Sequence, residues 1–150
     1  KISRIMLINE IKQIQNNRYP LLFIDKMLEV CPGESAKALK CYSYNEWFFP
    51  AHFEDEPNVP GFVLVESMVQ TFIMSFLTLP EHTGKKTSFI NISNVKFFKQ
   101  VIPGDTLISD AVLDSFKRGI ARGKVVTMRG KELVCKGEFT VALPSDIIKV

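Results

Sequence analysis

Residues 60–79 read PGFVLVESMVQTFIMSFLTL, the longest apolar stretch of the chain and the one that decides the fold. The stretch opens on Pro60-Gly61 and stops at Pro80. Apolar side chains occupy most of its circumference at helical spacing, and a helix that is apolar on nearly every side must be buried on nearly every side. As an α-helix it would be about 28 Å long. We therefore expect one long, buried helix at the centre of the protein.

A membrane span is the alternative for this stretch, since about 20 apolar residues cross a bilayer. Residues 62–79, however, contain Glu66, Gln70 and several serines and threonines. A glutamate in the middle of a bilayer is costly. We therefore expect a buried helix and no membrane span.

Strand patterns flank the helix on both sides. Residues 21–30 are rich in apolar side chains and end at a Pro-Gly turn, and residues 34–42 follow as the returning strand. Between residues 87 and 143, runs of alternating polarity separated by glycine-containing turns predict four more strands. Residues 3–15 have the apolar spacing of a short helix. Residues 1–150 are thus predicted to form one α+β domain, an antiparallel sheet of about six strands around one long helix.

Composition and charge argue against several functional classes of protein. Nineteen basic and sixteen acidic residues give a net charge of +3, which is too small to indicate a nucleic-acid-binding protein but weakly favours an acidic partner. Cys31, Cys41 and Cys135 contain no Cys-x-x-Cys pair, so we expect neither disulfides nor a zinc site, and a reducing, cytoplasmic location. With two histidines and no nucleotide- or metal-binding motif, no metal and no cofactor are expected.

One histidine is a candidate for proton transfer. His52 lies in the aromatic, proline-rich segment 45–60, which we expect to be an ordered loop. An imidazole there can exchange protons near neutral pH, although a satisfied structural histidine is the simpler interpretation. His82 lies in a polar loop and is expected to be solvated.

One carboxyl group is the second candidate, because Glu66 is the only charged residue of the apolar helix. A buried carboxylate is costly unless it is hydrogen-bonded. In one interpretation, Gln70, Ser67 or a backbone amide donates a hydrogen bond to the Glu66 carboxylate. In the other, the apolar surroundings keep the Glu66 carboxyl group protonated, so that it can act as an acid. Periodicity alone does not show whether Glu66 meets His52.

Four segments resemble motifs of the bacterial 3-hydroxyacyl-acyl-carrier-protein dehydratases, in the order in which that family has them. The matched family motifs are His-Arg-Tyr-Pro-Phe-Leu-Leu-Val-Asp at residues 18–25, Phe-x-Gly-His-Phe-Pro at 49–53, Pro-Gly-Val-Leu-x-x-Glu-Ala-Met-Ala-Gln at 59–70, and Lys-Phe-x-Arg-Pro-Val-x-Pro-Gly-Asp at 95–105. The spacing between His52 and Glu66 is also that of the family.

The resemblance implies a hot-dog fold and a homodimer with two active sites at the subunit interface, which in many relatives assembles into a trimer of dimers. His52 would take a proton from C2 of a 3-hydroxyacyl chain carried on the phosphopantetheine of acyl carrier protein, and Glu66 would protonate the departing hydroxyl. The Gly61 amide would polarise the thioester carbonyl, beside Phe53 and Phe62 as further substrate-binding residues. The product would be a trans-2-enoyl thioester in fatty-acid or related acyl-chain biosynthesis.

Several residues depart from the family pattern: Ala51, Glu54 and Gln100 differ from its usual residues, and Asn17 stands where the family has histidine. Chain-length preference therefore stays open, as do two alternatives: a non-catalytic acyl-binding hot-dog subunit and a hot-dog acyl thioesterase. Basic residues expected near the tunnel mouth are candidates to dock the acidic carrier protein. They are Lys96, Lys99, Arg118, Arg122 and Lys124.

Overall fold

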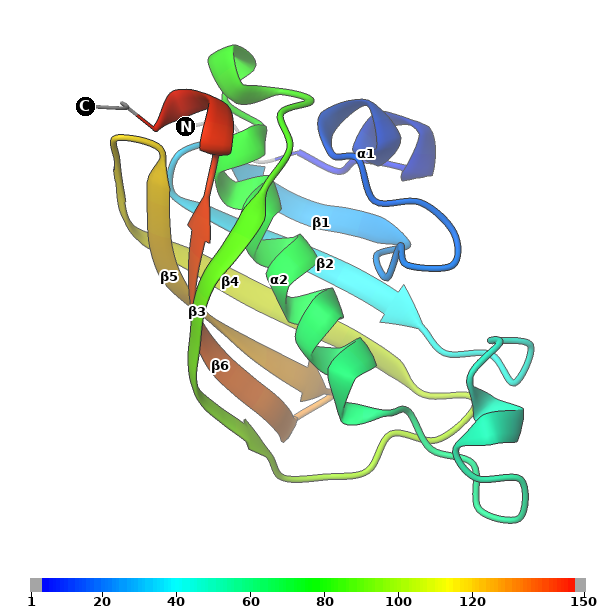
Figure 1. The fold of residues 1–150 in the computed structure, drawn as a ribbon. Helices are drawn as coiled ribbons and strands as arrows, with labels where there is room; N and C mark the ends of the chain where they lie inside the picture. The colour runs from blue at the N-terminus through cyan, green and yellow to red at the C-terminus, as the bar shows by residue number, and fades with distance from the viewer. Residues whose placement is uncertain (1–3, 148–150) are drawn as a thin grey trace.

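The computed structural model describes residues 4–147 and is built around one helix, α2 (Gly61–Leu77). Every residue from Ser67 to Leu77 is buried. An antiparallel sheet curves around this helix, as Figure 1 shows. The expected long buried helix is confirmed. No helix among residues 4–147 combines the length and apolar character that crossing a membrane requires.

The sheet has six strands, and all neighbouring pairs are antiparallel. The strands are β1 (Lys26–Cys31), β2 (Ser35–Cys41), β3 (Ser88–Phe97), β4 (Thr106–Lys117), β5 (Ile120–Arg129) and β6 (Glu132–Ala142). Their order is β1-β2-β4-β5-β6-β3, so β2 and β4 are neighbours although α2 and β3 lie between them in sequence. This is the predicted α+β hot-dog arrangement. Three 3₁₀ turns complete the fold: η1 (Phe49–Ala51), η2 (Pro80–His82) and η3 (Pro144–Asp146).

The first strand starts later than predicted. Residues 21–25 precede β1 as irregular chain, and over residues 21–23 a buried side chain of α2 binds backbone groups in place of a neighbouring strand. The Phe23 N–H donates to Gln70 Oε1 at 2.7 Å, and Gln70 Nε2 donates to the Leu21 carbonyl at 2.6 Å. The prediction of a strand from residue 21 was therefore wrong over its first five positions.

The first helix is also shorter than predicted. Helix α1 spans Ile8–Ile14, and the chain before it is extended, because the backbone of Met6 pairs with that of Met27 through two hydrogen bonds. Ser3, the first turn of the predicted helix, lies outside the described residues. Helix α1 therefore begins only after the segment that pairs with β1.

Close packing between helix and sheet explains one glycine. The rings of Phe72 and Phe139 stack with centroids 6.4 Å apart, so α2 lies directly against β6. At Gly123 on β5, an added Cβ would lie 2.5 Å from the Phe72 ring and 2.2 Å from the Val112 carbonyl oxygen. Only glycine leaves room for the Phe72 ring at this point of the sheet.

Candidate active site

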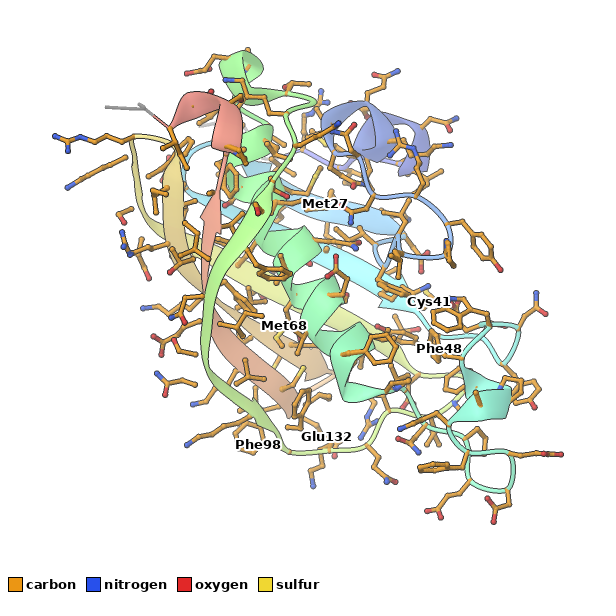
Figure 2. All side chains as sticks on the ribbon, viewed as in Figure 1. Met27, Cys41, Phe48, Met68, Phe98 and Glu132 are labelled. Atoms are coloured by element: carbon orange, nitrogen blue, oxygen red, sulfur yellow. The ribbon has the colours of Figure 1, made fainter. Side chains whose placement is uncertain are left out.

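The loop before α2 is ordered by its own aromatic side chains, as predicted. Phe48 and Phe49 are buried, with ring centroids 4.9 Å apart. The Trp47 indole N–H donates to the Pro20 carbonyl at 3.0 Å, which joins the loop to the segment before β1. Figure 2 shows Phe48 beside the N-terminal end of α2. The loop therefore has a fixed position next to the start of the helix.

A buried lysine holds the near end of this loop. Lys40, at the end of β2, is only 7% exposed. Its Nζ lies 3.1 Å from Glu46 Oε2 and 3.7 Å from Asp25 Oδ1, and it stands 5.2 Å from the centroid of the Tyr42 ring. Burying a lysine is tolerated here because two carboxylates accompany it. The sequence analysis missed this cluster, since no local pattern shows that Lys40 is buried or that Asp25 lies beside it.

Arg129 holds the far side of the loop, and the sequence analysis missed it too. Its guanidinium donates to the Gln100 carbonyl at 2.8 Å and to Asp105 Oδ2 at 2.6 Å. The segment that it binds accepts a 2.8 Å hydrogen bond at the Val101 carbonyl from the Val59 N–H. Figure 2 shows Phe98 and Glu132 at this end of the sheet, where that segment meets the β5–β6 turn. Arg129 thus supports the chain directly before α2.

His52 is half-buried in this loop, and its ring has one defined partner. Its Nδ1 lies 3.2 Å from the Asn58 carbonyl oxygen. Because a carbonyl only accepts hydrogen bonds, Nδ1 carries the hydrogen, and Nε2 is the basic nitrogen of the neutral ring. The Phe53 ring stacks on the imidazole with centroids 4.5 Å apart. The imidazole is therefore oriented, with Nε2 available as a base.

Glu66 is half-buried on α2, and Gln70 is its main partner. Gln70 Nε2 donates to Glu66 Oε2 at 2.9 Å, and Asn17 Nδ2 approaches the same oxygen at 3.4 Å. Ser67, the other candidate partner, instead donates to the Phe23 carbonyl at 2.9 Å. Of the two side chains considered as partners of Glu66, Gln70 is therefore the one that binds its carboxyl group.

Glu66 also faces an apolar cavity. The cavity has a volume of about 350 Å³ and is lined by Leu21, Phe23, Phe62, Val65, Glu66, Phe89 and Ile92. A second space of about 190 Å³ is also lined by Glu66, and Asn17, Gln70, Thr87 and Ser88 are among its walls. The carboxyl group is thus the polar point in the wall of an otherwise apolar chamber, which suits a ligand with a hydrocarbon chain.

The start of α2 supplies further groups near this chamber. Gly61 is the first residue of the helix, so its N–H has no acceptor within the helix. A Cβ at Gly61 would lie 3.3 Å from the Phe97 ring, so glycine keeps the backbone accessible beside that ring. Phe62 is 60% exposed although it lines the cavity, and Phe53 is 56% exposed.

The structure does not join His52 to Glu66 within one protomer. Among residues 4–147, His52 bonds to Asn58 and Glu66 bonds to Gln70 and Asn17, with no hydrogen bond or ion pair between the two candidates. His52 does not line either chamber beside Glu66. One protomer therefore presents a base and an acid at separate places.

The basic candidates fall into two groups. Lys96 and Lys124 line one surface hollow of about 340 Å³ on the outer face of the sheet. Arg122 is exposed on β5, the strand that also carries Lys124, and Lys99 follows the end of β3. Arg118 lies instead in the β4–β5 turn, in a hollow shared with Leu79 at the other end of α2. Arg118 is therefore separated from the Lys96 and Lys124 hollow, because this hairpin turns at the opposite end of the sheet.

His82 is not solvated as expected. Its side chain is 15% exposed, and Nδ1 lies 3.0 Å from Asp146 Oδ2, while its ring packs edge-on against Phe116. Lys85 Nζ donates to Asp146 Oδ1 at 2.7 Å, and this bond holds the pKa of Asp146 below its usual value. These groups join the chain after β6 to the end of α2, far from the cavity.

Within residues 4–147, no three His, Cys, Asp or Glu side chains gather closely enough to hold a metal ion.

Comparisons with known proteins agree with this geometry. Residues 15–138 match the family model of the FabA-like domain. The 3-hydroxyacyl-(acyl-carrier-protein) dehydratase FabZ of Roseiflexus sp. is 41% identical over 141 residues, which cover 94% of this chain and 99% of that protein. The dehydratase of the same name from Roseiflexus castenholzii is 43% identical over 136 residues, covering 91% and 95%. Among solved structures, the dehydratase heterocomplex ApeI:P from Xenorhabdus doucetiae matches with a TM-score of 0.76 at 12% identity, covering 89% of this chain and 90% of the other, which is a likeness of fold.

Proposed function

This chain belongs to the FabA-like domain family, and on that premise we propose that it dehydrates 3-hydroxyacyl-acyl-carrier-protein to the trans-2-enoyl product in fatty-acid biosynthesis. The observation that carries the proposal is the Glu66 carboxyl in the wall of an apolar chamber, on the helix that starts at Gly61. The apolar chamber can hold an acyl chain, and the carboxyl group can bind a polar substituent near the thioester end of that chain. The names of the two FabZ relatives state this activity for those proteins.

The two candidate residues divide the proton transfers between them. His52 Nε2 takes the proton from C2, and the electrons of that C–H bond form the C2–C3 double bond. The C3–O bond breaks, and Glu66 gives its proton to the departing hydroxyl, which leaves as water. His52 ends protonated and Glu66 ends ionised, so exchange with solvent returns both to their starting states.

The first turn of α2 stabilises the intermediate charge in this proposal. Loss of the C2 proton places negative charge on the thioester oxygen. The Gly61 N–H, at the positive end of a 17-residue helix dipole, can donate to that oxygen. Phe53 and Phe62 lie beside His52 and the cavity respectively, where they can cover the substrate from solvent.

A homodimer completes the site in this proposal. His52 and Glu66 do not meet within one protomer, so we assign the base of one subunit to the acid of the other. Strand β3 ends the sheet, and its side chains Phe89, Ile90 and Ile92 are 46%, 53% and 42% exposed. An exposed apolar edge strand next to the Glu66 cavity is a surface that a second copy can cover. Assembly of such dimers into a trimer is a further expectation from the family.

Docking of the carrier protein is assigned to the basic side chains of the outer face. Lys96, Lys99, Arg122 and Lys124 offer positive charge to an acidic carrier, whereas Arg118 lies at the other end of α2. Carrier proteins bearing phosphopantetheine-linked chains are thus the proposed partners. The three free cysteines accord with the proposed cytoplasmic location.

Product identity tests the proposal. A short 3-hydroxyacyl thioester should give the absorbance of a conjugated enoyl thioester; free acid would indicate a thioesterase, and an unchanged substrate an acyl-binding protein. His52→Ala and Glu66→Gln should each lower turnover by at least about 100-fold while the protein stays folded. Glu81→Gln is the matched control, since Glu81 is an exposed carboxylate of η2 outside the site. Near-normal turnover of either active-site variant, with a normal melting temperature, would contradict the role assigned to that residue.

A further inference from the structure

Two amide groups converge on a single oxygen of Glu66, from opposite parts of the chain. Gln70 Nε2 lies 2.9 Å from Oε2, one helical turn along α2, and Asn17 Nδ2 lies 3.4 Å from the same atom, just beyond the end of α1. Because both donors point at Oε2, the acidic hydrogen of the carboxyl group is left to Oε1. We propose that Asn17 is a positioning residue that orients the Glu66 carboxyl for proton donation, an inference that rests on the proposed dehydration.

The backbone of Asn17 is held firmly enough to orient another side chain. Its N–H donates to Gln15 Oε1 at 2.5 Å, and Gln15 is fully buried. The Arg18 guanidinium donates to the carbonyls of Lys12, Gln15 and Asn17 at 2.6, 2.8 and 2.8 Å. Carbonyls at the end of a helix lack N–H donors within it, so the donors of Arg18 stabilise the end of α1. This arrangement fixes the point from which the Asn17 amide reaches Glu66.

The position of Asn17 in the cavity wall fits this role. Asn17 and Glu66 both line the 190 Å³ space next to the apolar chamber, with which it shares Glu66 and Phe89. Among residues 4–147, the only hydrogen bond of the Asn17 side chain is the one to Glu66. Gln70, by contrast, also binds the Leu21 carbonyl and the Phe23 N–H. Substituting Gln70 would therefore disturb the cavity wall as well, whereas substituting Asn17 removes one donor from one carboxyl group.

A pair of isosteric substitutions separates positioning from structure. Asn17→Asp keeps the shape of the side chain, removes the N–H donor and adds a negative charge. Asn16→Asp makes the same change of charge at the neighbouring position, where the side chain donates to the Gly84 carbonyl at 2.8 Å and has no bond to Glu66. Asn17→His restores an N–H donor through its ring. Glu66 becomes ionised as it gives up its proton, so loss of a donor to this developing charge predicts a fall in kcat of about tenfold for Asn17→Asp.

The expected pattern is specific to kcat. Asn17→Asp should leave KM within about twofold of wild type, because the apolar chamber that binds the chain is unchanged. Asn17→His should recover most of kcat, and Asn16→Asp should keep it even if its melting temperature falls. Asn17→Ala, which removes the donor without adding charge, replaces Asn17→Asp if that variant does not fold.

Three results would overturn the inference: an unchanged kcat in Asn17→Asp or its alanine substitute, an Asn17→His variant as slow as Asn17→Asp, or an equal loss in Asn16→Asp. Each would mean that Asn17 affects only folding or overall charge. A wild-type chain that forms no enoyl thioester would instead refute the proposed function, and the role of Asn17 with it. Wild-type turnover alongside an unaffected Asn17 variant would refute the positioning role alone.

Discussion

Two inactive variants should restore activity to each other if one site is shared between two subunits. In the structure, His52 is fixed to Asn58 and Glu66 to Gln70, with no bond between the two candidates in one protomer. If the base comes from one subunit and the acid from the other, a dimer of His52→Ala with Glu66→Gln has one site with both lesions and one site with neither. Mixing the purified variants and allowing subunits to exchange therefore creates intact sites that neither parent contains.

The size of the recovery follows from twofold symmetry. With random pairing, half of the dimers are mixed and half of their sites are intact, so about a quarter of wild-type activity should return. Both variants should fold and therefore still pair as subunits, because both side chains are only half-buried. Enoyl thioester formation gives the rate, and native mass spectrometry gives the fraction of mixed dimers.

Mixing each variant with a tagged copy of itself is the control, and it should restore nothing. If both residues came from one subunit, every site would keep one lesion and the mixture would stay inactive. An inactive mixture with confirmed exchange would therefore exclude a site shared between two subunits.

Three further predictions concern packing, pH and docking. Gly123→Ala should destabilise the fold by about 1–3 kcal/mol, because the new methyl group overlaps the Phe72 ring; urea unfolding measures it, and a loss below the experimental error would contradict the packing. Burial raises the pKa of Cys135 to about 11, so the folded state keeps a thiol proton that the unfolded state loses above about pH 8.5. Stability should accordingly fall by up to about 1.4 kcal/mol per pH unit above about pH 8.5, and Cys135→Ala should lack this slope below about pH 10, above which buried Tyr42, whose pKa burial also raises, adds a slope of its own. Lys124→Glu should raise KM for carrier-bound substrate more than for a small thioester, with Arg118→Glu at the other end of α2 as the control; equal effects on both substrates would remove the docking assignment.

Local patterns predicted the elements of this fold well. The apolar run at 60–79 led directly to a buried helix, because its burial depends only on which side chains the helix carries. Strand β6 alternates as expected, with Gly137, Phe139 and Val141 buried while Lys136 and Glu138 are exposed. The first strand was misjudged because its opening residues hydrogen-bond to a side chain of α2, and no pattern within residues 21–25 reveals a partner 47 residues away.

The supports of the candidate site were harder to find, because they depend on burial and contacts that only the folded chain creates. Lys40 and Arg129 look like ordinary strand lysine and arginine residues until the fold brings carboxylates to them. The spacing of His52 and Glu66 likewise suggested the pair, yet it says nothing about whether they face each other across one subunit or two. That information lies in the orientation of the loop relative to α2, which three-dimensional packing determines.

The few polar side chains of α2 explain how an apolar helix can carry an acid. Ser67 and Gln70 bind backbone groups of the irregular residues Leu21 and Phe23. The same Gln70 amide then reaches Glu66, so one buried side chain satisfies the chain beside the cavity and the carboxyl group within it. An uninterrupted strand at residues 21–25 would have left Gln70 without these partners, and a buried amide without partners is costly. The departure from regular strand structure is therefore the feature that allows a hydrogen-bonded carboxyl group to lie in the wall of an apolar chamber.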